Sequence, residues 1–294
     1  MVRHGSDRCR GPHRGRGDLG INFLDTSPAY GDGRSERILG KAASEIGRDQ
    51  VVLSTKMAVA GSMPGEPVQF MKPEEVGPAL DESLQRLQTD YIDVMLMAVA
   101  DVPEAFATVV DDIIPEFLRL KEQGKIRFLG SSEQTRSDGA HIWLRHVLPT
   151  DQVDVAMVGH NMLNQSAART VLPLCRERGI GAINVFTVRN LFWNVPRLTE
   201  VLTDLTNRGV ITQDTMADES PLSWLLEEGE CDCLVEAAYR YAAHTEGISL
   251  VMCGTIVKSQ LEDDIAYIEK GPLPAAALER LRETFGHIDE VMGN

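Results

Sequence analysis

The feature that most constrains this chain is the alternation of short apolar runs with amphipathic helical patterns from residue 20 onward. The runs are rich in β-branched residues, have the length of strands, and mostly lie roughly 30 residues apart, which is the spacing of βα units. Near-continuous apolar strands of this kind belong to parallel sheets covered by helices. The sequence therefore predicts an α/β protein with seven strands, over residues 21–26, 51–56, 91–97, 126–132, 153–159, 182–187 and 250–255.

The ends of these runs favour a closed barrel over an open doubly wound sheet. An open sheet that binds a dinucleotide carries G-x-G-x-x-G after an early strand, and no predicted strand here is followed by that motif. A TIM barrel instead assembles its active site from strand ends around the whole ring. We therefore predict a TIM (β/α)8-type barrel from the polar residues that end the runs, which are Asp25, Lys56, Ser132 with Glu133, His160 and Thr255.

The formal net charge of −15 at pH 7 limits the partners that the chain can have. This charge repels phosphate backbones and anionic lipid, so we expect no nucleic acid and no membrane as a partner. No run approaches the roughly 18 apolar residues of a membrane span, and we expect a cytoplasmic protein. Cys231 and Cys233 form a C-x-C without a second ligand pair, and we expect no metal. A small molecule remains the expected partner, and a homo-oligomer is possible.

Four segments taken together resemble the aldo-keto reductases: "LGINFLDTSPAYGDGRSERILGKA", "VVLSTK", "DYIDVMLM" and "GKIRFLGSS". The resemblance covers about residues 18 to 270 in order, and the ordered set is far more specific than any single segment. It implies a TIM barrel enzyme that uses NADPH or NADH. Its implied substrate is a small carbonyl compound or alcohol.

In that family an aspartate, a tyrosine, a lysine and a histidine act together, and the resemblance assigns the first three to Asp25, Tyr30 and Lys56. A tyrosine hydroxyl has a reference pKa near 10, and an adjacent ammonium lowers such a pKa. The aspartate would hold the lysine charged and in place. The tyrosine could then hand a proton to a carbonyl oxygen while the cofactor gives hydride to the carbon.

The histidine of the family is replaced here by Ala98, at the end of the run 91–97. Alanine cannot donate a hydrogen bond to the substrate carbonyl, and losing one such donor costs about 3 to 4 kcal/mol of transition-state stabilisation. Two groups could replace the histidine as hydrogen-bond donor to the substrate carbonyl. One is a water molecule in the space left by the ring, and the other is His160 from another strand end.

The resemblance also marks the residues expected to hold the cofactor. Ser132 and Glu133 replace a Ser-Asn pair that holds the carboxamide, and Phe186 is the candidate for stacking on the nicotinamide. The segment "CGTIVKSQLEDDI" resembles the loop and helix start that bind the adenosine phosphate. A carboxylate beside a 2′-phosphate is unfavourable, which weakens the case for NADP over NAD. The expected cofactor-binding residues of this segment are Gly254, Thr255, Lys258, Gln260 and Asp264.

Residues 1–17 hold five arginines, four glycines and one proline, a composition that forms neither a buried strand nor an amphipathic helix. We expect a disordered basic tail over residues 1–17 and a barrel domain over residues 18–294. Because the family has its first strand and helix at this place, the barrel is expected to lack its opening βα unit. Three interpretations are open: a basic arm, a shortened relative with an open strand edge, and a misassigned start. The composition favours the last two.

Our leading hypothesis is an oxidoreductase that resembles the aldo-keto reductases, retains Asp25, Tyr30 and Lys56, and has lost the histidine. Two alternatives remain. One is a barrel that has lost catalysis and acts as a binding or regulatory protein. The other is a lyase or isomerase that uses Tyr30 and Lys56 as acid and base without hydride transfer.

Overall fold

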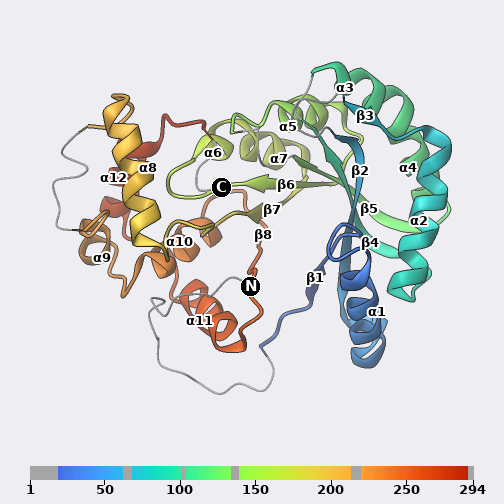
Figure 1. The fold of residues 1–294 in the computed structure, drawn as a ribbon, viewed down its shortest axis with the longest axis horizontal. Helices are drawn as coiled ribbons and strands as arrows, with labels where there is room; N and C mark the ends of the chain where they lie inside the picture. The colour runs from blue at the N-terminus through green and yellow to red at the C-terminus, as the bar shows by residue number, and fades with distance from the viewer. Residues whose placement is uncertain (1–18, 62–67, 101–102, 134–138, 213–219, 291–294) are drawn as a thin grey trace. The chain divides into compact units, whose positions relative to one another are not determined.

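The computed structural model describes residues 19–61, 68–100, 103–133, 139–212 and 220–290. They form two compact units, an N-terminal unit of residues 20–158 and 174–181 and a C-terminal unit of residues 19, 159–173, 182–212 and 220–290. Figure 1 shows the helices and strands of both units. The predicted tail over residues 1–17, with the expected loss of the opening βα unit, lies outside the described residues. Within the described ranges, no helix is long and apolar enough to cross a membrane, and no three His, Cys, Asp or Glu side chains gather as metal ligands.

The N-terminal unit contains a parallel sheet in which β1, β2, β4, β5 and β6 follow one another in the order of the chain. This order is the one that successive βα units produce. The short strand β3 pairs antiparallel with the end of β2 and was not predicted, because two residues show no periodicity. The bounds are β1 Phe23–Asp25, β2 Val52–Gly61, β3 Gln69–Phe70, β4 Ile92–Val99, β5 Ile126–Glu133 and β6 Val155–Gly159.

One helix of this unit begins at a start signal that the sequence contains. The helix α2 starts at Pro73, and the side chain of Glu75 accepts a hydrogen bond from the backbone N–H of Lys72 at 2.9 Å, which caps the first turn. Its apolar face is buried, and α2 packs against α1 and α4. The bounds are α1 Arg34–Ile46, α2 Pro73–Leu87, α3 Pro103–Thr108, α4 Ile114–Glu122 and α5 Ile142–Val147, with short helical turns at Arg48–Gln50, Val109–Ile113 and Leu148–Thr150.

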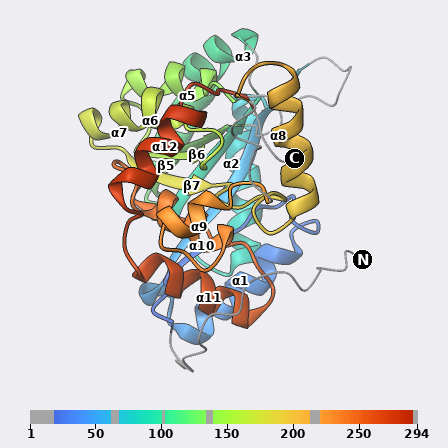
Figure 2. The ribbon, with the colours of Figure 1, turned by 90° about the vertical axis from the view of Figure 1, so that its left-hand side faces the viewer.

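In the C-terminal unit β7 and β8 pair in parallel, and α9 contacts both α10 and α12, which lie close to it in Figure 2. Apolar side chains of α8, α9 and α12 belong to one buried cluster, which includes Leu198, Leu202, Leu225, Leu281 and Phe285. The bounds are α6 Ser166–Thr170, β7 Gly181–Val185, α8 Val195–Asn207, α9 Trp224–Glu228, α10 Leu234–Ala243, β8 Leu250–Val251, α11 Lys258–Glu269 and α12 Ala275–Phe285. The helix α7, Leu172–Arg178, belongs to the N-terminal unit from Leu174 onward.

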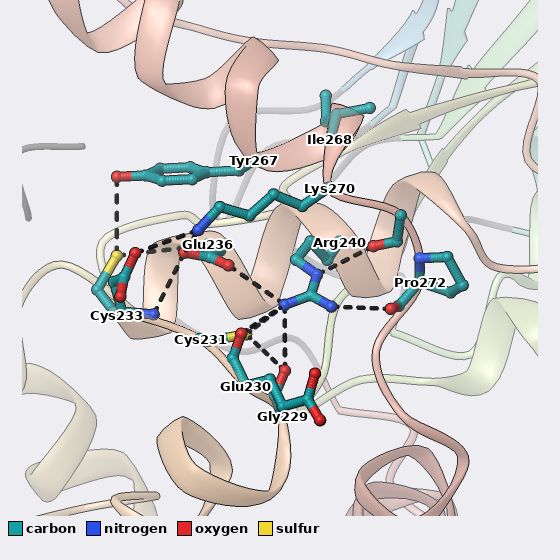
Figure 3. A network of polar contacts seen from close by, with 12 residues as sticks. Gly229, Glu230, Cys231, Cys233, Glu236, Arg240, Tyr267, Ile268, Lys270 and Pro272 are labelled. Atoms are coloured by element: carbon teal, nitrogen blue, oxygen red, sulfur yellow. Dashed lines mark hydrogen bonds and ion pairs between the residues drawn. The ribbon is translucent and has the colours of Figure 1, made fainter. Parts of the chain in front are cut away.

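A buried ionic network joins α10 to the segment that follows α11 (Figure 3). The Arg240 guanidinium donates to the carbonyl oxygens of Gly271 and Pro272, each at 2.9 Å, and to the carboxylate of Glu236 at 3.2 Å. The other oxygen of Glu236 accepts from Lys270 at 2.8 Å. Because a buried charge is tolerated only when it is paired and hydrogen-bonded, these contacts fix the end of α11 against α10.

Candidate active site

Asp25 and Lys56 lie side by side on neighbouring strands. Asp25 is the last residue of β1 and pairs with Ser54 of β2, so Lys56 follows two residues later on the same face of the sheet. The Lys56 ammonium binds the Asp25 carboxylate and donates to the carbonyl oxygen of Thr26 at 3.0 Å. The lysine and aspartate side chains are 13% and 10% exposed, respectively. The structure therefore holds this ammonium group in one place.

Tyr30 lies in the turn that connects β1 to α1. Its backbone N–H donates to the carbonyl of Ser27 at 3.0 Å, and Gly33 N–H donates to the carbonyl of Pro28 at 2.7 Å. The Lys56 ammonium lies 5.2 Å from the centroid of the Tyr30 ring, and the tyrosine is 50% exposed. The structure thus brings together the three predicted catalytic residues and leaves the tyrosine accessible to a ligand.

Ala98 is half-buried near the end of β4 and pairs with Ala58 of β2 and Ser132 of β5. Its methyl group offers no hydrogen-bond donor. The neighbouring residue at this level of β2 is also an alanine, so the strand pair β2 and β4 presents two small side chains at this level. The position expected for the family's histidine is therefore filled by an apolar side chain.

Glu36 is a residue of this region that the sequence analysis missed. It is fully buried on α1, where one carboxylate oxygen accepts from the hydroxyl of Thr55 at 2.7 Å and the other binds the guanidinium of Arg86. Burial by itself lowers the pKa of Arg86, but the hydrogen bonds and charges of Glu36 and Glu82 outweigh that effect and raise the pKa. The available signal was spacing, since Glu36 shares a buried helix face with Gly40 and Ala43.

Ser132 and Glu133 end β5, and both are buried. The two carboxylate oxygens of Glu133 lie 2.9 and 2.8 Å from Nδ1 of His141, which is also buried. The hydroxyl of Ser132 is 3.5 Å from the Glu133 carbonyl oxygen. At this place the structure shows an internal carboxylate–imidazole pair, which the sequence could not indicate because eight residues separate its members.

In the C-terminal unit His160 is fully buried, its Nε2 lies 3.2 Å from the hydroxyl of Thr245, and its ring stacks on Tyr241 with centroids 5.2 Å apart. Burial raises the pKa of Tyr241, so this hydroxyl stays protonated beside the imidazole. These surroundings are those of a hydrogen-bonded structural histidine.

Phe186 follows β7 with a φ of 66°, which is rare for a residue that is not glycine. Its carbonyl oxygen accepts from the side-chain amide of Asn161 at 3.3 Å. The guanidinium of Arg189, a residue whose own φ is 46°, lies 3.8 Å from the centroid of the Phe186 ring. One face of the aromatic ring predicted to stack on a nicotinamide is therefore covered by a cation.

The loop before α11 presents the other predicted cofactor residues. The Thr255 hydroxyl donates to the side chain of Gln260 at 2.6 Å and accepts from Val257 N–H at 3.1 Å. Lys258 is 71% exposed and forms an ion pair with Glu262 at 3.6 Å. A Cβ built on Gly254 would meet no atom within 4 Å, so the chain is open there.

Asp264 is buried inside the C-terminal unit, with 1% of its surface exposed. The pKa of Tyr239 is raised, first by burial and then by Cys253 and the Asp264 carboxylate. Asp264 therefore contacts α10 and is not part of the exposed first turn of α11. This first turn contains no acidic residue.

Comparison with known proteins finds one matching family model and relatives among proteins of known activity. The model of the "Aldo/keto reductase family" matches residues 17–284. The NADH-specific methylglyoxal reductase of Escherichia coli (strain K12) is 33% identical over 170 residues, which are 55% of this chain and only 50% of that protein. L-galactose dehydrogenase of Arabidopsis thaliana is 27% identical over 287 residues, covering 93% of this chain and 81% of the relative.

Solved structures show the same fold. The holo form of the aldo-keto reductase AKR11C1 from Bacillus halodurans has a TM-score of 0.65 at 22% identity and covers 90% of this chain and 83% of its own. An aldo/keto reductase from Klebsiella pneumoniae, solved in complex with NADP and acetate, has a TM-score of 0.58 at 18% identity. The match covers 94% of this chain and 83% of that protein. This likeness confirms the predicted (β/α)8-type fold.

Proposed function

Because this chain belongs to the aldo/keto reductase family, whose members are NAD(P)H-dependent oxidoreductases, we propose that it reduces a carbonyl or oxidises an alcohol with Tyr30 as its proton donor. The observation that carries this proposal is the contact of Lys56 with both Asp25 and the ring of Tyr30. The short distance between the Lys56 ammonium and the exposed Tyr30 ring supports the proposal.

Each of these residues has a separate task in the proposed reaction. Tyr30 gives its hydroxyl proton to the carbonyl oxygen, and the Lys56 ammonium offsets the negative charge that develops on the tyrosine oxygen. Asp25 restrains the lysine through their ion pair. When bound, the nicotinamide supplies the hydride. In alcohol oxidation the deprotonated oxygen of Tyr30 would accept the alcohol proton, and the Lys56 ammonium would stabilise that oxygen beforehand.

Each unit, taken by itself, has residues that fit one part of a nicotinamide cofactor complex. The first turn of α11 has no side-chain cap and no acidic residue, so its N–H groups suit a phosphate. One carboxylate oxygen of Asp25 is buried without a hydrogen-bond partner among the described residues, an acceptor that a ligand hydroxyl could satisfy. Gly254, Thr255, Lys258 and Gln260 would hold the adenosine end. The burial of Asp264 keeps its carboxylate away from that turn, so we include both NADPH and NADH.

We expect the purified chain to bind NADPH or NADH with a Kd of about 1 μM, at the tight end of the range of enzyme KM values. The binding is measured by titration of nicotinamide fluorescence and checked by calorimetry. Lys258→Ala is the matched variant, and it should weaken the binding of NADPH more than the binding of NADH. Absence of binding for both cofactors would contradict the proposal and favour a barrel that binds another partner.

Restoring the missing donor gives a second test. We expect Ala98→His to raise kcat by up to about a hundredfold, because one well-placed donor is worth that much to the transition state. The size-matched control Ala98→Leu fills the same space without a donor and should not raise kcat. The kinetic measurement uses methylglyoxal and L-galactose, the compounds in the names of the two relatives, with each cofactor. Equal effects of both substitutions would refute the donor argument.

A second candidate function is favoured by Ala98 alone. Without a donor at this position, the pair Tyr30 and Lys56 could serve as acid and base in an elimination or isomerisation. Turnover of a carbonyl substrate in the absence of any nicotinamide would distinguish this function from the first.

A further inference from the structure

The turn that carries Tyr30 is tied to the two strands beside it through the first residues of α1. Ser35 N–H donates to the carbonyl of Tyr30 at 3.2 Å, and the Ser35 hydroxyl accepts from the hydroxyl of Thr26 at 2.7 Å. The carbonyl of Thr26 in turn accepts from Lys56 at 3.0 Å. A short chain of contacts therefore runs from the proposed proton donor to the lysine beside it.

The next residue of α1, Glu36, forms a second tie. Its carboxylate accepts from Thr55, which directly precedes Lys56 on β2, and binds Arg86 of α2. Both Glu36 and Thr55 are fully buried, so water cannot replace either partner. Two adjacent residues of this helix turn, Ser35 and Glu36, thus fix the turn to the residue that follows β1 and to β2 and α2.

The close approach of Arg86 is supported by the backbone of the turn itself. Gly33 precedes α1 with a φ of 73°, and a Cβ at this position would lie 2.6 Å from Cδ of Arg86. Only glycine therefore allows the guanidinium stem to pass this close to the turn. The contact with Arg86 is built into the path of the chain between Tyr30 and Glu36.

We propose that Glu36 is a positioning residue for Tyr30, acting through Thr55 and Arg86 to hold the first turn of α1 and hence the hydroxyl of Tyr30 beside Lys56. The inference rests on the proposed function for its catalytic consequence. A displacement of about 1 Å in such a group can lower a rate a hundredfold without touching the reacting atoms. The carboxylate contributes rigidity and does not contact substrate.

The test uses Glu36→Gln and Thr55→Val, with Thr55→Ser as the variant that keeps the hydroxyl. Asp93→Asn is the matched control, because Asp93 is a buried carboxylate of the same unit that binds Arg48 and Arg127, at 2.7 and 2.8 Å, at the other end of the strands. The readouts are kcat, KM, melting temperature, and the aromatic NMR signal of Tyr30, which is assigned by its absence in Tyr30→Phe.

We expect Glu36→Gln and Thr55→Val to lower kcat about tenfold to a hundredfold with KM changed by less than about twofold, and to shift the Tyr30 signal. Thr55→Ser should keep the wild-type kcat and the wild-type Tyr30 signal. Asp93→Asn should lower only the melting temperature. A wild-type Tyr30 signal and kcat in both variants would overturn the proposal, and Thr55→Val decides if Glu36→Gln does not fold. If the wild-type chain shows no turnover at all, the proposed function fails, and the NMR signal alone decides the role of Glu36.

Discussion

Replacing Tyr30 with phenylalanine should lower kcat by about a hundredfold to ten-thousandfold, the range measured when a positioned proton donor is removed. The substitution deletes only the hydroxyl, and the ring keeps its place 5.2 Å from the Lys56 ammonium. Because Tyr30 is half exposed and its turn is held by backbone hydrogen bonds, the melting temperature should not change. Steady-state kinetics with saturating cofactor, together with a thermal melt, measure both quantities.

Tyr91→Phe is the control for loss of a tyrosine hydroxyl in the same unit. The Cζ atoms of Arg48 and Arg127 lie 3.9 and 4.1 Å from the centroid of the Tyr91 ring. Phenylalanine preserves these two contacts. Its kcat should equal that of the unmodified chain. Undiminished turnover in Tyr30→Phe would remove this residue from the mechanism, and an equal loss in Tyr91→Phe would show a general effect on folding.

Replacing Arg240 with methionine should lower the free energy of unfolding of the C-terminal unit by about 3 to 5 kcal/mol, the usual effect of removing one partner of a buried ion pair. The change leaves the fully buried Glu236 with Lys270 as its ion-pair partner (Figure 3). It also removes the donors to the carbonyl oxygens of Gly271 and Pro272. Denaturant-induced unfolding, followed by tryptophan fluorescence, measures the difference.

Arg282→Met is the matched control, since Arg282 forms an exposed ion pair with Glu279 on the surface of α12. Exposed pairs contribute little, so this variant should unfold at the same denaturant concentration as the unmodified chain. If Arg240→Met behaves in the same way, the network in Figure 3 does not hold the end of α11.

The order of strands and helices was predictable because periodicity is local. All seven predicted strands are present, with bounds shifted by a few residues, and α2 starts at the expected Pro73. The proximity of Asp25, Tyr30 and Lys56 could also be anticipated. The first two residues flank one turn, and neighbouring parallel strands end at the same edge of a sheet, which brings Lys56 to them.

The partners of buried polar side chains were decided only by the tertiary structure. Glu133 was expected to face a cofactor and is bonded to His141, and Asp264 was expected beside a phosphate and is buried against Tyr239. The spacing of Glu36 with Gly40 and Ala43 indicated only that it is buried, and not that it joins α1 to β2 and α2. The apolar pattern of a segment determines which of its faces is buried. The hydrogen-bond donors that meet this buried face come from other segments of the chain, and their positions depend on the tertiary fold. No local sequence pattern contains this information.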